Sequence, residues 1–173
     1  MIEAYPYPPS VAFEPTAVAP WLCYVICPNT NRDEMRAHGR AALRQILGRD
    51  VLESKHGPTA SNLQLSISYA GHLCLLGVSL GAAQFGIDLV QLAAFDDWSI
   101  NELHDVAAVY LPQKPNNAVE FAQQWAIFEA SNKALKRGIQ ENSTTPISRS
   151  WAVKGLPAGF IGSVVVVDNP LID

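Results

Sequence analysis

The order of the expected secondary-structure elements repeats along the chain, and this order constrains the fold more than any single motif does. Residues 21–79 read as strand, helix, strand and strand, and residues 85–168 read as strand, helices, strand and strand. The amino acids themselves do not repeat. Two similar α+β halves packed as a pseudo-dimer would explain this order, and a ligand cleft between the halves would be a natural consequence.

Hydrophobic periodicity predicts the strands. Residues 62–69 alternate apolar and polar side chains, which is typical of a strand with one buried face. Residues 21–27 form a continuous apolar run, which indicates a buried strand. The expected strands span residues 21–27, 62–69, 72–79, 85–92, 147–153 and 159–168.

Capping patterns predict three helices, because in each case Asn or Ser is followed by Glu three residues later. The last helix should end at a glycine preceded by two basic residues, which suit the negative end of the helix dipole. The expected helices run from Asn31 to Gly48, from Ser99 to about Tyr110 and from Asn117 to Gly138.

The first twenty residues contain five prolines, which remove backbone donors from a sheet. We therefore expect residues 1–20 to form an extended arm over the surface. The rest should be one compact unit with an N-terminal half at residues 21–82 and a C-terminal half at residues 83–173. With 49% hydrophobic and only 16% charged residues, the chain has the material for a substantial core.

Charge and composition exclude several classes of protein. A net charge of −4 without a basic run argues against general nucleic-acid binding. No apolar run reaches the roughly 18 residues of a membrane span, and the N-terminus lacks a signal-peptide pattern, so a cytoplasmic location is expected. The three cysteines lack CxxC spacing and favour neither a disulfide framework nor a zinc site; Cys23 and Cys27 are expected to be buried thiols.

Asp88 interrupts the apolar strand expected at residues 85–92, where an unpaired charge would be costly to bury. Strand alternation places Gly86 on the same face, and a glycine there leaves room for a ligand or another backbone to approach. Two interpretations stay open: a carboxylate that faces solvent or caps a turn, or a site residue.

Glu129 lies on the long helix, four residues before Lys133. Taken alone, it indicates a surface ion pair that contributes a few tenths of a kcal/mol. Its aromatic neighbours Trp125 and Phe128 favour a less solvated setting. If the helix crosses the strand of Asp88, the two carboxylates could bind one Mg²⁺, which prefers oxygen ligands and completes its shell with phosphates and water. Lys133 could then meet a phosphate as a point charge.

Ser66 and Ser68 share one face of the strand at residues 62–69, which ends beside Gly71. They are either an exposed strand face or part of a phosphate-binding strand end with nearby backbone amides.

Together these segments resemble the paired signatures of the 4′-phosphopantetheinyl transferase superfamily. "FGIDLVQL" is similar to its G-I-D strand, and "WAIFEASNKALKRG" is similar to its helix of the form W/F-x-x-K-E-(A/S)-x-x-K-A. Its surfactin-type branch is matched more weakly at three places: "SISYAG" at the N-x-S-H-S strand end, Gly57–Pro58 at the G-(K/R)-P motif, and Gly39 with Arg44 at the G-x-x-x-x-R helix.

The resemblance implies an α+β pseudo-dimer, expected to be monomeric, that binds coenzyme A and Mg²⁺ between its halves. The implied reaction transfers 4′-phosphopantetheine from coenzyme A to a serine of an acyl or peptidyl carrier protein. Asp88 and Glu129 would hold Mg²⁺, Glu129 or a metal-held water would deprotonate the serine, and Lys133 would stabilise the phosphate charge. The coenzyme contacts that the resemblance implies are Ser68, Tyr69, Gly57, Pro58, Arg44 and Lys133.

Several positions depart from the family patterns. Phe128 stands where the helix motif has lysine, and Tyr69 where the strand end has histidine. Val90 and Gln91 stand where the two branches of the family have a further acidic ligand. Phe128→Lys combined with Tyr69→His is therefore expected to strengthen coenzyme A binding. Two alternatives stay open: a catalytically impaired member that acts as a carrier-protein-binding or regulatory module, and another magnesium-dependent nucleotide-binding enzyme on the same scaffold.

Overall fold

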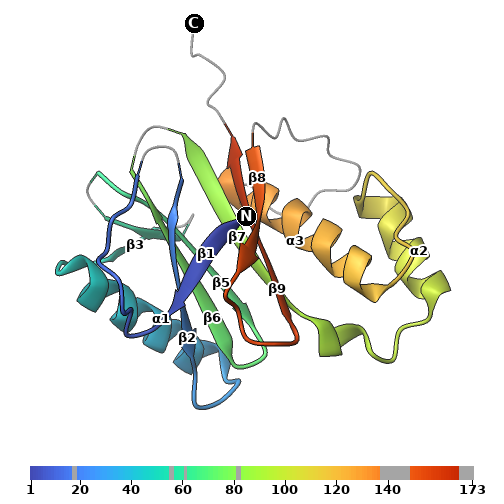
Figure 1. The fold of residues 1–173 in the computed structure, drawn as a ribbon, viewed down its shortest axis with the longest axis horizontal. Coiled ribbons are helices and arrows are strands. Elements are labelled where there is room, and N and C mark those ends of the chain that lie inside the picture. Colours follow the sequence, from blue (N-terminus) through green and yellow to red (C-terminus); the bar gives the residue numbers. More distant parts are fainter. Residues whose placement is uncertain (17–18, 55–56, 61, 81–82, 137–148, 168–173) are drawn as a thin grey trace, which may run out of the picture.

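The protein has an α+β fold, with nine strands and three α-helices in the described part of the chain (Figure 1). The computed structural model describes residues 1–16, 19–54, 57–60, 62–80, 83–136 and 149–167. The strands are β1 (Ile2–Pro6), β2 (Trp21–Ile26), β3 (Leu52–Ser54), β4 (Gly57–Thr59), β5 (Gln64–Ala70), β6 (Leu73–Ser79), β7 (Gln84–Gln91), β8 (Arg149–Lys154) and β9 (Phe160–Val167). The helices are α1 (Arg32–Leu47), α2 (Ile100–Tyr110) and α3 (Ala118–Ala134), with a 3₁₀ turn at Leu92–Phe95.

Seven of the strands form one sheet in the order β5-β6-β2-β1-β8-β9-β7, and β3 pairs separately with β4. On one side of β1, β6 pairs antiparallel with both β5 and β2. On the other side, β9 pairs antiparallel with both β8 and β7. In chain order, α1 follows the first strand of one group and α3 follows the first strand of the other. The two three-stranded units therefore share one strand order and one set of pairings.

The expectation that residues 1–20 lie as an arm over the surface is wrong for Ile2–Pro6, which form the central strand β1. This strand runs parallel to β2 on one side and to β8 on the other, and Ala4 is only 2% exposed. The physical reason is that the first proline is Pro6, so residues 2–5 keep the N–H donors that the two neighbouring strands require.

The predicted helix starts are confirmed. Asn31, Ser99 and Asn117 are the N-cap residues of α1, α2 and α3, and each side chain accepts a hydrogen bond from a backbone N–H of the first turn. The long helix ends at Ala134, and its expected end at Gly138 lies outside the described residues.

The expected strands are also present. In the described part of the chain their ends differ from the predicted ends by at most two residues. Residues 147, 148 and 168, at the ends of the last two expected strands, are not described. The short strands β3 and β4 have no counterpart among the predictions.

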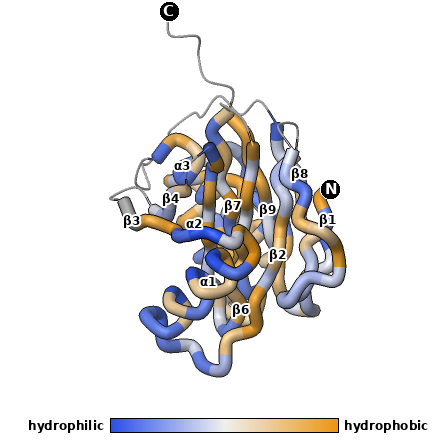
Figure 2. The backbone as a smooth tube through the Cα atoms, turned by 90° about the vertical axis from the view of Figure 1, so that its left-hand side faces the viewer, coloured by the Kyte–Doolittle hydropathy of each residue, from blue (hydrophilic) through white to orange (hydrophobic). Residues whose placement is uncertain are grey.

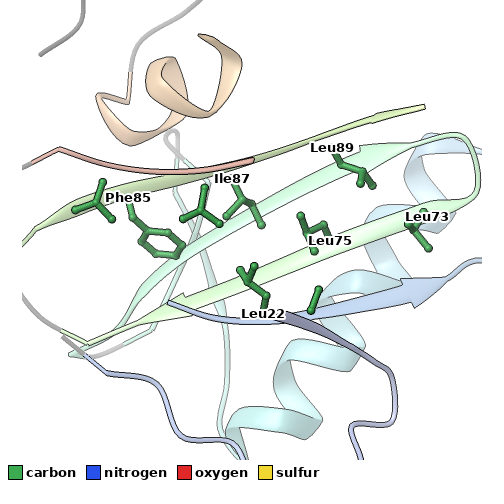
Figure 3. Packing of buried hydrophobic residues seen from close by; sticks show 9 residues of the cluster. Leu22, Leu73, Leu75, Phe85, Ile87 and Leu89 are labelled. Atoms are coloured by element: carbon green, nitrogen blue, oxygen red, sulfur yellow. The ribbon is translucent and has the colours of Figure 1, made fainter. Parts of the chain in front are cut away.

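One of the two largest buried clusters lies between the two three-stranded units. Alternate residues of β7, from Phe85 to Leu89, pack against leucines of β2 and β6 in one buried cluster (Figure 3). Helix α1 packs on the other face of β2 and β6, and α3 on the other face of β7 and β9 (Figure 1). Figure 2 shows the hydrophobic residues concentrated along the strands, as this arrangement requires. As a consequence β5 and β7, at opposite ends of the strand order, lie side by side.

Cys23, Cys27 and Cys74 are free and buried, which confirms the prediction for the first two. Burial raises the pKa of Cys23 to about 12, so this thiol is protonated at neutral pH and is a poor nucleophile or metal ligand. None of the described helices combines the length and the apolar composition needed to cross a membrane.

Candidate active site

A cavity of about 430 Å³ opens where β5 and β7 meet. Its lining includes Ser68 from β5, Asp88 from β7, and Glu129 and Lys133 from α3. Tyr69 lines it too. The structure thus brings together five of the predicted site residues, although they come from three separate elements.

Gly86 sets the distance between β7 and α3. A Cβ atom at this position would lie 2.1 Å from the carbonyl oxygen of Ala130 and 2.6 Å from the amide nitrogen of Ala134. Only glycine permits two backbones to approach so closely. The prediction that Gly86 leaves room for another backbone is confirmed, and this close approach brings α3 against the strand that carries Asp88.

Asp88 is buried, with 3% of its surface exposed, so the solvent-facing alternative is wrong. Its Oδ1 accepts a hydrogen bond from Ser68 Oγ at 2.7 Å and forms an ion pair with Lys133 Nζ at 2.7 Å. Within the described residues Oδ2 has no hydrogen-bond partner, while Asp88 lines the cavity. Among the described residues, one carboxylate oxygen is therefore neutralised and the other receives no hydrogen bond.

Ser66 and Ser68 are 7% and 2% exposed, so the alternative of an exposed serine face is wrong. Ser66 Oγ accepts a hydrogen bond from the backbone N–H of Ile87 at 3.1 Å. Ser68 Oγ accepts one from the backbone N–H of Leu89, also at 3.1 Å. These hydroxyls join β5 to β7 where no regular backbone pairing does so. The two serines can be buried without an unpaired polar group, because each hydroxyl accepts a hydrogen bond from a backbone N–H that would otherwise lack a partner in the sheet.

The ammonium group of Lys133 lies 2.7 Å from Asp88 Oδ1 and 2.9 Å from Ser68 Oγ. Its ion-pair partner is thus the strand carboxylate, and the surface pair with Glu129 suggested by helical spacing is not formed. Because 34% of the lysine side chain remains exposed, the ammonium can also contact a ligand in the cavity.

Glu129 Oε1 accepts a hydrogen bond from Trp125 Nε1 at 3.0 Å. Burial raises the pKa of Glu129 above its ordinary value, and the negative charge of Asp88 raises it further. The positive charge of Lys133 and the bond from Trp125 oppose this rise in pKa. A carboxylate with a raised pKa is a stronger proton acceptor near neutral pH than an ordinary glutamate.

We expect Glu129→Gln to stabilise the metal-free protein by an amount that grows with pH. The pKa of Glu129 in the folded chain lies above its ordinary value of 4.5, so ionisation costs the folded state stability that a neutral glutamine does not lose. In thermal denaturation with a chelator, the two proteins should unfold at similar temperatures near about pH 4, and the variant at a higher temperature near about pH 7. A less stable variant at the higher pH would contradict the raised pKa.

Phe128 does not line the cavity. It is 8% exposed and packs against the rings of Tyr110 and Trp125, in the hydrophobic cluster that joins α2 to α3. The structure therefore gives no support to the expectation that Phe128→Lys contributes to coenzyme A binding, because a lysine at this position would lie in an apolar cluster and not in the cavity lining.

Phe128→Lys should instead destabilise the fold by about 3 kcal/mol or more, through lost packing and the burial of an unpaired ammonium group. Phe128→Leu, which stays apolar, should cost about half as much or less. Urea denaturation of the two variants measures the difference. Equal, small losses would show that this side chain is not buried.

Three expected coenzyme contacts do not line the cavity. Gly57 and Pro58 lie in β4, and Arg44 is exposed near the end of α1. The basic residue that α1 contributes to the lining is Arg32, at the start of the helix. The sequence carries no signal for Arg32, because its position depends on how α1 packs against the sheet.

Asp88 and Glu129 are the carboxylates that could hold a metal ion at this cavity. No group of three or more His, Cys, Asp or Glu residues suited to a metal occurs in the described part of the chain. Val90, which stands where the family resemblance would place a further acidic ligand, is 7% exposed and packs against Ala122 and Ala126 of α3. Two carboxylates are sufficient for Mg²⁺ when phosphate oxygens and water complete its shell. The residues therefore fit magnesium held jointly with a phosphorylated ligand.

A scan against protein-family models found no matching family, and a search of curated proteins found no match to this chain.

Proposed function

We propose that this chain is a Mg²⁺-dependent 4′-phosphopantetheinyl transferase that acts on coenzyme A and an acyl or peptidyl carrier protein. One observation carries the proposal: Asp88 of the G-I-D strand lines the same cavity as Glu129 and Lys133 of the long helix. The cavity thus combines the oxygen ligands that Mg²⁺ prefers with a cation that suits a phosphate.

The arrangement of the strands supports the proposal. The units β5-β6-β2 and β8-β9-β7 have the same order and the same antiparallel pairings. We interpret them as the halves of a pseudo-dimer, within residues 21–82 and 83–173. The cavity lies where β5 of one half meets β7 of the other, the place expected for a ligand bound between halves.

The residues of the cavity account for the acid–base and electrostatic parts of the transfer. Glu129 accepts the proton of the carrier serine as the serine oxygen attacks a phosphorus of the coenzyme A pyrophosphate. A bond forms between that oxygen and phosphorus, and the bond from phosphorus to the leaving 3′,5′-adenosine bisphosphate breaks. Lys133 stabilises the negative charge on the phosphoryl oxygens. Asp88 and Glu129 would hold Mg²⁺, and the bound ion would supply positive charge to offset the negative charge of the phosphates.

Thermal-shift titration with coenzyme A, with and without Mg²⁺, tests ligand binding. Binding to the native state raises its stability, by about 2.7 kcal/mol when the ligand is present at a hundred times its dissociation constant. We expect a rise in melting temperature that depends on Mg²⁺, and none with pantetheine, which lacks phosphate groups. No shift with millimolar coenzyme A and Mg²⁺ would contradict the proposal.

A second function, a non-catalytic module that binds a carrier protein, is favoured by the charge balance of the site. Lys133 neutralises Asp88 without a metal ion, and the position of a further acidic ligand is taken by the buried Val90. Calorimetry with an apo carrier protein, followed by its mass spectrometry in the presence of coenzyme A and Mg²⁺, separates the two functions. Binding without a change in the mass of the carrier protein would favour the module.

A further inference from the structure

Ser68 uses the full hydrogen-bonding capacity of its hydroxyl group within the protein. A serine hydroxyl has one donor and two acceptor positions. Ser68 Oγ donates to Asp88 Oδ1 at 2.7 Å and accepts from Lys133 Nζ at 2.9 Å and from the backbone N–H of Leu89 at 3.1 Å. The residue lines the cavity but is only 2% exposed, so a coenzyme group could form a hydrogen bond to this hydroxyl only by displacing one of its three partners.

Ser68, Asp88 and Lys133 form a closed triangle of hydrogen bonds, since Lys133 Nζ also lies 2.7 Å from Asp88 Oδ1. Each group is therefore held by the other two. Turning the carboxylate of Asp88 would break its bonds to both the hydroxyl and the ammonium, and the ammonium is held by two acceptors at once. Hydrogen bonds with charged partners are the stronger ones, so this triangle is a stiff arrangement.

We infer that Ser68 is a positioning residue that fixes the carboxylate of Asp88 and the ammonium of Lys133 for the reaction. For the identity of that reaction the inference rests on the proposed function, and it gives Ser68 a role other than the coenzyme contact implied by family resemblance. Ser68 belongs to β5, whereas Asp88 and Lys133 belong to β7 and α3. One three-stranded unit thus sets the geometry of charged groups carried by the other, before any ligand arrives.

Ser66 offers a matched control in the same strand. Its Oγ accepts a backbone N–H bond from Ile87 at 3.1 Å, the same bond that Ser68 accepts from Leu89. Within the described residues, the hydroxyl of Ser66 has no hydrogen bond to Asp88 or Lys133. Ser66→Ala therefore removes one hydrogen bond from a backbone N–H of β7, whereas Ser68→Ala removes one bond of this kind and also opens the triangle.

The rate at which Lys133 is acetylated reports its position independently of any transfer activity. The proteins are treated with the N-hydroxysuccinimide ester of acetic acid, and modification of Lys133 is followed by peptide mass spectrometry. We expect Ser68→Ala to be modified at Lys133 several times faster than the wild type, and Ser66→Ala to match the wild type. Equal rates in all three proteins, or the same acceleration in both variants, would overturn the inference.

Transfer kinetics distinguish positioning from coenzyme binding. Ser68→Ala should lower kcat about tenfold or more while KM for coenzyme A changes less than about twofold. A raised KM with unchanged kcat would overturn the inference. If Ser68→Ala does not fold, Ser68→Cys, whose thiol is a weak donor and acceptor, carries the same expectations. If the wild type transfers nothing, the proposed function fails, and the acetylation rates still decide the role of Ser68.

Discussion

Glu129→Gln should lower the rate of phosphopantetheine transfer by about 10³-fold or more, although the same change raises the stability of the metal-free protein. Glutamine has nearly the same shape and can still accept the hydrogen bond from Trp125 Nε1. It cannot accept a proton at neutral pH, and it is a weaker ligand for Mg²⁺. The lost activity would therefore come from the chemistry of the carboxylate and not from a damaged fold.

Glu120→Gln is the control for this experiment. Glu120 lies in the first turn of the same helix, where its carboxylate accepts hydrogen bonds from Asn116 at 2.8 Å. It does not line the cavity, so transfer should stay within about twofold of the wild type. The measurement is the initial rate of carrier-protein modification under saturating coenzyme A. Full activity in Glu129→Gln would remove Glu129 from the proposed mechanism.

Gly86→Ala should destabilise the fold by about 3 kcal/mol or more, a large effect for one methyl group. The added Cβ atom would lie 2.1 Å from the carbonyl oxygen of Ala130 in α3, which is far inside van der Waals contact. Neither backbone can move away without separating β7 from α3, which would also carry Glu129 and Lys133 away from Asp88. Urea denaturation should show the loss of stability.

Gly48→Ala shows what an ordinary glycine substitution costs in this protein. Gly48 follows α1 with a φ of 61°, and a Cβ atom there would meet nothing within 4 Å. Its replacement should therefore cost only the strain of the left-handed conformation, about 1 kcal/mol. A cost for Gly86→Ala no larger than that for Gly48→Ala would contradict the close contact between β7 and α3.

Local patterns were sufficient to predict most of the elements. Caps and apolar spacing are properties of neighbouring residues, so Asn31, Ser99 and Asn117 identified the helix starts correctly. Strand alternation also separated the two faces of β7, with Ile87 in the core and Asp88 on the face toward α3. These predictions needed no knowledge of how the elements pack.

Tertiary contacts decided what the sequence could not. Ile2–Pro6 became a central strand because two distant strands pair with it. Lys133 has a carboxylate four residues away in the helix, yet it pairs with Asp88, because α3 lies against β7. The motif placed Phe128 where a site lysine was expected, but the side chain packs in the hydrophobic cluster shared with α2. A motif gives the position of a residue along the helix and does not show which neighbour that side of the helix contacts.

Mass spectrometry of an apo carrier protein incubated with this protein, coenzyme A and Mg²⁺ measures the proposed transfer itself. We expect the carrier protein to gain the mass of one phosphopantetheine group at its serine. The gain should require Mg²⁺, and Glu129→Gln should suppress it while Glu120→Gln does not. A carrier protein that is bound by this chain but keeps its original mass, in a mixture where coenzyme A also binds, would show that this chain is not a phosphopantetheinyl transferase.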